Sequence, residues 1–432
     1  MPTHPPVTRR EIVGWAMFDF ANSAYTTIIV TVAFSIYFTK LVVPGERADF
    51  LWGLAVLLSN LIVVLGAPIV GAIADDSGRK KLLLGGTWIG CVLSTSALWL
   101  VLPGAVGLAL VLFVLSNVAY AYGESLAGAF LPEISTPATI GRISGFGWGL
   151  GYMGGLGSLF LVLPLVKPGF TVENLSNLRL AWVVTGLFFL VGGLPTFLWL
   201  RERAPRGPLR SLSGYTREGF HRLANTLRSL AHFRQLARFL AVFTLFSAGL
   251  GAIIAFAAIY AERTVGFDGG EIIGLFLVLQ ISAGLGAVLF GWLQDRIGAK
   301  RTIQIALVLW LAVTAGAWAT QTKTAFWAVA LASGLGIGSL QSASRALVGL
   351  FSPRSKSGEL FGFWGLASRV AYMIGPATFG AVSSWTGSQR TAVAINGLFF
   401  LAGLLGMAGI DEKAGREAAI TWTGPPSATS SG

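Results

Sequence analysis

The sequence predicts an all-α membrane protein in which twelve transmembrane helices form two pseudo-symmetric six-helix bundles. Hydrophobic residues make up 54% of the 432 residues and charged residues only 12%, whereas soluble domains carry about 25% charged residues. Twelve apolar stretches are long enough to cross a bilayer. A charged turn that begins at Gly71 occurs again at Gly291, an offset of 220 residues (291 − 71). This repeat indicates two related halves.

The spans are windows of about 20 apolar residues, the length that crosses about 30 Å of hydrocarbon. Each span is expected to be a helix, because lipid offers no hydrogen bonds to the backbone. The first half contains the predicted spans Ile12–Leu41, Phe50–Ala74, Leu82–Leu102, Val106–Phe130, Ile143–Val166 and Leu180–Leu200. The second half contains Leu236–Tyr260, Glu271–Leu293, Thr302–Thr320, Ala325–Val348, Leu360–Val382 and Thr391–Ile410.

The two bundles are predicted to comprise residues 1–200 and 236–410, joined by a cytosolic linker at 201–235. Within the linker, Phe220, Leu223 and Leu227 recur at helical spacing among arginines, which predicts an amphipathic helix on the membrane surface. A solvated charged linker is the alternative. Residues 411–432 are predicted to be a disordered cytosolic tail, because the end of the chain is rich in Pro, Ser, Thr and Gly.

Lysine and arginine concentrate in the loops on one side of the predicted spans, for example at Arg79–Lys81 and throughout 201–238. The positive-inside rule therefore predicts that both termini are cytosolic, in an integral protein of the plasma or inner membrane. The net charge of +12 lies mainly on this face, where it attracts anionic membrane lipid. Nucleic acid is not an expected partner, because the spans leave no soluble basic domain.

The repeated turn reads Gly-x-x-x-Asp-x-x-Gly-x-basic-basic in both copies. Its first glycine lets neighbouring helices approach closely, and its second permits the dihedral angles of a tight turn. Its aspartate can accept hydrogen bonds from the N–H groups that are free at a helix start. A purely structural turn is the alternative to a moving part. The residues of this candidate gating loop are Gly71, Asp75, Gly78, Arg79, Gly291, Asp295, Gly298 and Arg301.

Four charged side chains lie inside the predicted spans and away from the first and last three residues of each, where each costs about 2.5–3.5 kcal/mol or more. Glu124 and Arg345 differ by 221 residues, close to the repeat offset, so we expect them to pair as a cytosolic gate. Snorkelling of Arg345 to the surface and a partner for Glu124 within its own half are the alternatives. Arg369, near the middle of its span, needs an anionic partner, which is either Asp19 or a carboxylate of the solute.

The first predicted span carries the richest polar cluster of any span. Asn22, Ser23 and Tyr25 follow Asp19 within two turns. Such a cluster can bind a substrate or carry a coupling proton, because polar groups within the membrane usually serve a function. A structural ion pair of Asp19 is the alternative.

Several segments resemble a known family of transporters. The repeated turn resembles the signature loop of the major facilitator superfamily. Trp15–Tyr25, Ile143–Tyr152, Ser344–Ala346 and Gly375–Pro376 resemble the "unknown major facilitator" family, which includes the fungal vacuolar amino-acid effluxers. One departure is Asp76, which stands where the superfamily loop usually has a basic residue.

The resemblance implies the major facilitator fold and a secondary transporter that moves a small polar solute by alternating access. It further implies that the repeated loop locks one conformation, that transport is efflux, and that amino acids or related metabolites are the first substrate class. Protons are a candidate coupling ion, and sugars, drugs and peptides are alternative substrates. A membrane sensor on the same fold is the alternative function.

Enzyme chemistry is not expected. The sequence has neither a His/Asp/Ser constellation nor a cluster of metal ligands, since its three histidines lie in predicted cytosolic segments. We therefore expect no catalytic residue, metal or cofactor. The expected partners are a small-molecule solute and membrane lipid, and the expected oligomeric state is a monomer.

Overall fold

The computed structural model describes residues 6–43, 47–205, 207 and 232–422. Its first half consists of α1 (Arg9–Ala24), η1 (Tyr25–Val32), α2 (Phe34–Tyr37), η2 (Phe38–Val42), α3 (Ala48–Ser77), α4 (Lys80–Ala97), η3 (Leu98–Leu100), α5 (Val106–Gly128), α6 (Leu131–Ile134), α7 (Ile140–Val166) and α8 (Leu175–Trp199). Its second half consists of α10 (Arg234–Tyr260), η5 (Ala261–Val265), α11 (Gly269–Ile297), α12 (Ala299–Ala319), α13 (Lys323–Leu350), η6 (Arg354–Lys356), α14 (Ser357–Thr386), α15 (Gln389–Ala408) and α16 (Glu412–Ile420).

The predicted all-helical membrane fold is confirmed. Within the described residues, eleven helical segments have the length and apolar composition of a membrane span. The remaining predicted span, Leu360–Val382, corresponds to α14, whose 30 residues are enough to cross a bilayer. No membrane is part of the structure, so these spans follow from length and composition.

The hydrogen-bonding pattern of the first span changes along its length. It begins as an α-helix whose Thr8 cap and Glu11 form a reciprocal capping box. From Tyr25 to Val32 the helix is π-helical. This form is rare overall, and where it occurs it is often part of a functional site. Regular α-helix resumes only at Phe34, after Ala33 leaves the helical region with φ −121°. Hydropathy alone predicts the length of this span but not its π-helical part.

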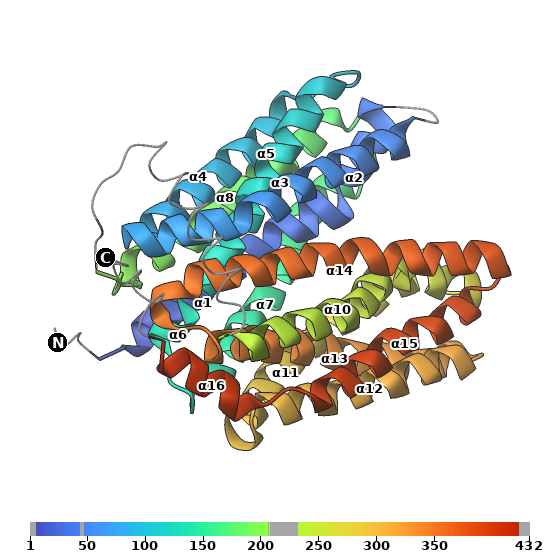
Figure 1. The fold of residues 1–432 in the computed structure, drawn as a ribbon. Coiled ribbons are helices and arrows are strands. Elements are labelled where there is room, and N and C mark those ends of the chain that lie inside the picture. The colour runs from blue at the N-terminus through green and yellow to red at the C-terminus, as the bar shows by residue number, and fades with distance from the viewer. Residues whose placement is uncertain (1–5, 44–46, 206, 208–231, 423–432) are drawn as a thin grey trace, which may run out of the picture.

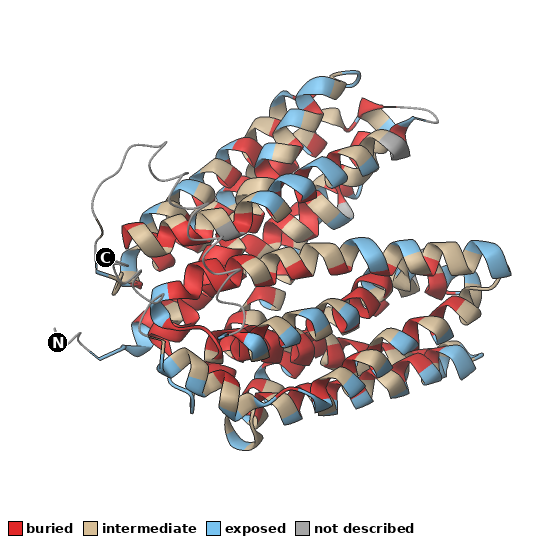
Figure 2. Ribbon diagram, in the orientation of Figure 1, coloured by how far each residue is buried: buried red, intermediate tan, exposed pale blue. Residues whose placement is uncertain are grey.

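Each half forms its own bundle, and the two bundles meet at one end of the molecule (Figure 1). Both described ends of the chain lie at that end, which we call the terminal face. The halves touch chiefly where α7 packs against α11 and where α3 packs against α14. Buried residues gather where the halves meet near the terminal face, and exposed residues lie on the outer helix surfaces (Figure 2).

Two predictions about the segments outside the bundles have different outcomes. The predicted disorder of 411–432 is wrong for its first part, because α16 forms over Glu412–Ile420 and Asp411 caps its free N–H groups. This short helix packs back onto the bundle through Gly415, which lies against the Phe351 ring, a contact that composition does not reveal. The predicted amphipathic linker helix falls mostly on 208–231, outside the described residues.

Candidate functional site

A cavity of about 680 Å³ lies between the two halves. Near the middle of the spans it is lined by Glu124 on α5 and Arg369 on α14. From there it extends away from the terminal face, as far as Tyr260 at the end of α10 and Val393 near the start of α15. The cavity therefore reaches toward the end of the molecule opposite both termini.

The two halves line the cavity differently: the first half contributes mostly polar side chains, and the second contributes mostly apolar ones around Arg369, Gln280, Gln341 and Tyr372. The first half supplies hydroxyl and carboxylate groups on α1, η1, α5 and α7, namely Ser23, Thr26, Thr27, Thr31, Tyr120, Glu124, Ser125 and Tyr152. The second half supplies large apolar side chains, among them Phe243, Phe246, Ile253, Phe256, Leu275, Phe276, Ile337, Leu340, Trp364 and Phe379. Such a cavity suits a solute that has both charged groups and an apolar body.

Glu124 and Arg369 form a loose ion pair across the two halves. The Arg369 Nη2 atom lies 3.8 Å from the Glu124 Oε2 atom, which is too long for a hydrogen bond. The side chains are 20% and 30% exposed, Arg369 first. Both charged groups therefore remain accessible from the cavity.

A second ion pair lies outside the cavity lining and is far more enclosed. The Arg345 Nη1 atom donates to the Asp19 Oδ2 atom at 2.6 Å. Arg345 also donates to the Ser144 hydroxyl at 3.1 Å and to the Ser144 carbonyl oxygen at 2.8 Å. The rings of Trp15 and Trp148 lie 4.8 and 5.2 Å from the guanidinium carbon. This cluster joins α1 and α7 of the first half to α13 of the second.

The structure contradicts the predicted pairing of Glu124 with Arg345, and it rules out Asp19 as the partner of Arg369 in this conformation. The two arginines are exchanged, because helix packing rather than the repeat offset decides which side chains meet. In this conformation α13 packs against α7, which lies beside α1, whereas α14 packs against α5. An offset of about half the chain identifies related positions, but related positions need not touch.

The polar cluster of the first span is divided between two surroundings. Ser23 lines the cavity, whereas Asp19 binds Arg345 behind it. The Tyr25 hydroxyl lies 2.8 Å from the Ser116 hydroxyl, and its ring stacks on Tyr120 within the first half. Asn22 is buried and does not line the cavity. Tyr25 and Asn22 thus belong to the packing of the first half in this conformation.

Polar cavity residues that the sequence reasoning missed include Tyr152, Gln280, Gln341 and Tyr372. The Tyr152 hydroxyl donates to the Gln341 side-chain oxygen and so links α7 to α13 across the halves. The two glutamines were detectable, because an uncharged amide within an apolar span is also costly unless it is used.

The two repeated loops make equivalent contacts at the terminal face. Asp75 accepts the N–H groups of Gly358 and Glu359, both at 3.0 Å. Asp295 accepts the N–H groups of Gly141 and Arg142 at 2.8 and 3.1 Å. Each aspartate therefore caps the start of a helix, α14 or α7, that belongs to the other half.

The glycines of the loops allow the helices to cross at very short range. A Cβ atom on Gly71 would lie 2.1 Å from the carbonyl oxygen of Gly358, and one on Gly291 would lie 2.5 Å from that of Gly141. Gly78 and Gly298 have φ values of 60° and 91°, which only glycine adopts without strain.

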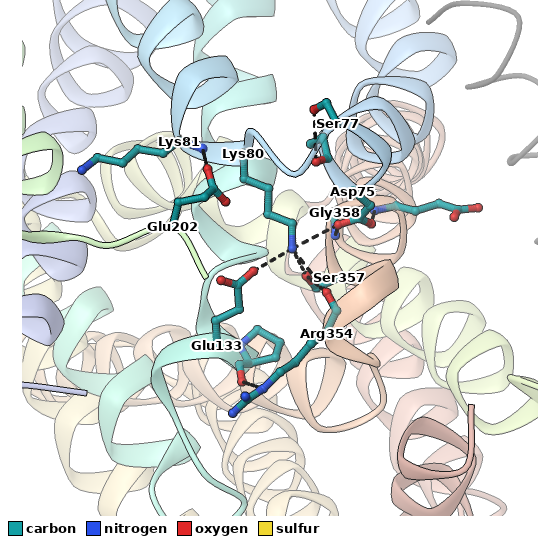
Figure 3. A network of polar contacts seen from close by, with 12 residues as sticks. Asp75, Ser77, Lys80, Lys81, Glu133, Glu202, Arg354, Ser357 and Gly358 are labelled. Atoms are coloured by element: carbon teal, nitrogen blue, oxygen red, sulfur yellow. Dashed lines mark hydrogen bonds and ion pairs between the residues drawn. The ribbon is translucent and has the colours of Figure 1, made fainter. Parts of the chain in front are cut away.

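The first loop adds a buried lysine that sequence reasoning did not single out. The Lys80 Nζ atom lies 3.1 Å from Asp75 Oδ1 and 2.8 Å from Glu133 Oε1, and it donates to the Ser357 hydroxyl at 2.6 Å (Figure 3). It thereby joins the start of α4 to α6 and, across the halves, to α14. The second loop has no such link, since Lys300 Nζ donates to the carbonyl oxygen of Ala408 within its own half.

The two basic residues of the candidate gating loop, Arg79 and Arg301, are more exposed than Lys80. Arg301 is exposed and Arg79 is only partly buried. The basic triplet at 79–81 does not itself indicate which of its three members turns inward.

Among the described residues, no group of three or more His, Cys, Asp or Glu side chains is arranged to hold a metal ion.

Comparisons with known proteins agree on one family. A family profile described as "Vacuole effluxer Atg22 like" matches residues 50–420. The chain is 24% identical over 409 residues to an uncharacterized MFS-type transporter, YxiO, of Bacillus subtilis, covering 93% of this chain and 94% of that one. It is 23% identical over 410 residues to autophagy-related protein 22 of Kluyveromyces lactis, covering 86% and 81%.

Another relative is longer than this chain. The match to autophagy-related protein 22-1 of Neosartorya fischeri has 26% identity and covers 66% of this chain but only 52% of the relative. The chain thus spans about half the length of that fungal protein.

Solved structures show the same fold. The human organic anion transporter MFSD10 superposes with a TM-score of 0.71 at 16% identity, over 94% of this chain and 100% of that one. The proton:xylose symporter XylE superposes with a TM-score of 0.70 at 15% identity, over 96% and 98%.

Proposed function

The chain belongs to the family of Atg22-like vacuole effluxers, and from this premise we propose that it moves a zwitterionic solute of the amino-acid class across the membrane by alternating access. As a member of this family it is a transporter of the major facilitator type and not an enzyme. The proposal concerns the solute, its direction and its coupling. Efflux across the plasma or inner membrane is the direction that we propose, whereas the family description names only efflux from a vacuole.

The observation that carries the proposal is the accessible pair of opposite charges in the cavity. A zwitterion can bind Arg369 through its carboxylate and Glu124 through its ammonium group, and so replace an ion pair that is only loosely made at 3.8 Å. The apolar wall of the second half can then receive an apolar side chain. The hydroxyl-rich wall of the first half favours the polar end of the solute.

Alternating access requires contacts that hold one end of the molecule closed. We assign this role to Asp75, Asp295 and the Asp19–Arg345 pair, because each joins the two halves on the terminal-face side of the cavity. If the termini are cytosolic, as the positive-inside rule predicts, the cavity as seen here extends outward. Protonation of Asp19 would weaken its bond to Arg345, which makes it the candidate coupling group.

Transport in proteoliposomes tests the substrate assignment. We expect counterflow of neutral amino acids with large apolar side chains, and little counterflow of sugars or dicarboxylic acids. Glu124→Gln and Arg369→Gln should each reduce amino-acid counterflow at least tenfold, because a charge-assisted hydrogen bond is worth about 1.5–3 kcal/mol. Ser368→Ala, next to Arg369 on the cavity wall, is the matched control and should retain most of the activity.

Two results would count against the proposal. Equal counterflow of sugars and amino acids would remove the zwitterion as the recognised chemistry. Specific binding of an amino acid without any counterflow would favour the alternative function, a sensor on the same fold.

A further inference from the structure

A second cavity, of about 410 Å³, lies at the terminal face between the two halves. The first half contributes the connection between α6 and α7, at Thr136, Pro137 and Ala138. The second half contributes the end of α11, the start of α12 and the C-terminal helix α16. No role described above uses this space.

A buried amide is the first sign that the cavity is built to hold a ligand. Gln294 lines the cavity and is only 3% exposed. Within the described part of the chain, neither its Nε2 nor its Oε1 atom has a hydrogen-bond partner. Buried amides are almost always hydrogen-bonded, so a ligand that bonds to Gln294 would satisfy an otherwise costly group.

Two guanidinium groups with spare donors border the same cavity. Arg296 stacks on the ring of Trp292, 3.4 Å from the ring centroid, an arrangement that leaves its N–H edges free. Arg416 contacts Glu412 through Nη1 at 3.7 Å, beyond hydrogen-bonding distance. Both side chains therefore retain donors for a ligand in the cavity.

The carboxylates that border the cavity are already engaged. Asp295 accepts two backbone N–H groups from the start of α7, and Arg142 lies 3.7 Å from it. Glu412 accepts the backbone N–H of Lys300 at 2.9 Å in addition to its contact with Arg416. The free hydrogen-bonding capacity of the cavity is thus mainly that of cationic and amide donors, which favours an anion.

We propose that this cavity binds a phosphate group through Arg296, Arg416 and the Gln294 amide, and that the bound phosphate holds the two halves together at the terminal face. Guanidinium groups match phosphate oxygens in paired hydrogen bonds. The phosphate contacts α11 and α16 of the second half while it lies against Thr136–Ala138 of the first. Its source is either a soluble phosphate or the headgroup of an anionic phospholipid, since Trp292 beside the cavity is half exposed, as at a membrane interface.

Thermal unfolding of the purified full-length protein tests the binding. At constant ionic strength, inorganic phosphate in place of chloride should raise the melting temperature increasingly with concentration, because it binds the folded state. Arg416→Ala and Gln294→Leu should each lower the apparent affinity for phosphate, taken from this concentration dependence, about tenfold or more. Lys413→Ala removes one positive charge from the same helix without bordering the cavity, so its response should equal that of the wild type.

A second arm of the experiment distinguishes the two sources of phosphate. If a lipid headgroup is the ligand, nanodiscs of phosphatidylglycerol should stabilise the wild type over nanodiscs of phosphatidylcholine, and the Arg416 and Gln294 variants should lose this difference. The binding proposal is overturned if neither arm stabilises the wild type. It is equally overturned if all four proteins respond alike.

The holding role needs a separate measurement, which is independent of transport. Spin labels at Ala138→Cys and Glu417→Cys, with the native Cys91 replaced by serine, report the separation of the α6–α7 connection from α16. The ligand found above should narrow this distance distribution toward its short end. Binding without any change in the distribution would overturn the holding role.

Discussion

At the scale of single residues, the most consequential contact is the buried pair of Asp19 and Arg345. Its side chains are 10% and 5% exposed, respectively, and the arginine is enclosed by Ser144 and two tryptophan rings. A charge that is buried this deeply depends on its partner. The pair therefore acts as a contact that is strong when complete and strongly unfavourable when half of it is removed.

We predict that Arg345→Gln lowers the stability of the protein by about 3–5 kcal/mol, because it leaves Asp19 charged and unpaired. Unfolding in detergent, followed by tryptophan fluorescence, measures the loss. The double variant Asp19→Asn with Arg345→Gln should be markedly more stable than Arg345→Gln alone, because it buries no charge. If the double variant is the less stable of the two, the ion pair is not the reason for the loss.

At the scale of helices, the crossings of α3 with α14 and of α7 with α11 depend on glycine. We predict that Gly71→Ala weakens the first crossing and shifts the protein toward the conformation that is open at the terminal face, because its Cβ would lie 2.1 Å from a backbone oxygen. Gly53→Ala lies on the same helix, where a Cβ would meet nothing within 4 Å, and is the matched control.

Alkylation of a cysteine introduced at Ser357, beside the loop contacts, measures this shift. The cysteine should react faster in the Gly71→Ala background than in the Gly53→Ala background. Equal rates in both would show that the close crossing does not control access from the terminal face.

The helices were largely predictable from the sequence, whereas their neighbours were not. Apolar windows predicted the spans because the bilayer thickness sets their length and because a backbone in lipid must satisfy its own hydrogen bonds as a helix. The π-helical part of the first span and the helix α16 were not predicted, since both depend on packing rather than on composition. The partner of Arg345 was also missed. The repeat offset is a distance in sequence, whereas the packing of the helices decides whether Asp19 or Glu124 lies beside Arg345.

At the scale of the whole molecule, contacts between the halves cluster on the terminal-face side and the main cavity lies on the other. Under the proposed mechanism, this arrangement couples the occupancy of the cavity to the closure of one end. Asp19 is connected to the cavity through Arg345 and Trp148. Asp19 pairs with Arg345, and Trp148 contacts the Arg345 guanidinium on one side and lines the cavity on the other. A proton on Asp19 would act on the whole molecule through this contact.

We predict that Asp19→Asn abolishes accumulation driven by a pH gradient but leaves counterflow measurable, because exchange of solute needs no net proton movement. Both assays on the same proteoliposomes check this, and counterflow serves as the control for folding. If Asp19→Asn still accumulates solute when a pH gradient is imposed, Asp19 is not the proton carrier.

The placement of Glu124 and Arg369 on opposite halves has a mechanical consequence. A zwitterion that touches both is a strut between two moving bodies, so the separation of its charges sets how far those bodies can close around it. An α-amino acid is a short strut that permits closure. An ω-amino acid has its charges several bonds farther apart and would keep the two halves from closing. We expect it to bind in the cavity and to block the transport cycle, as an inhibitor that is not itself transported.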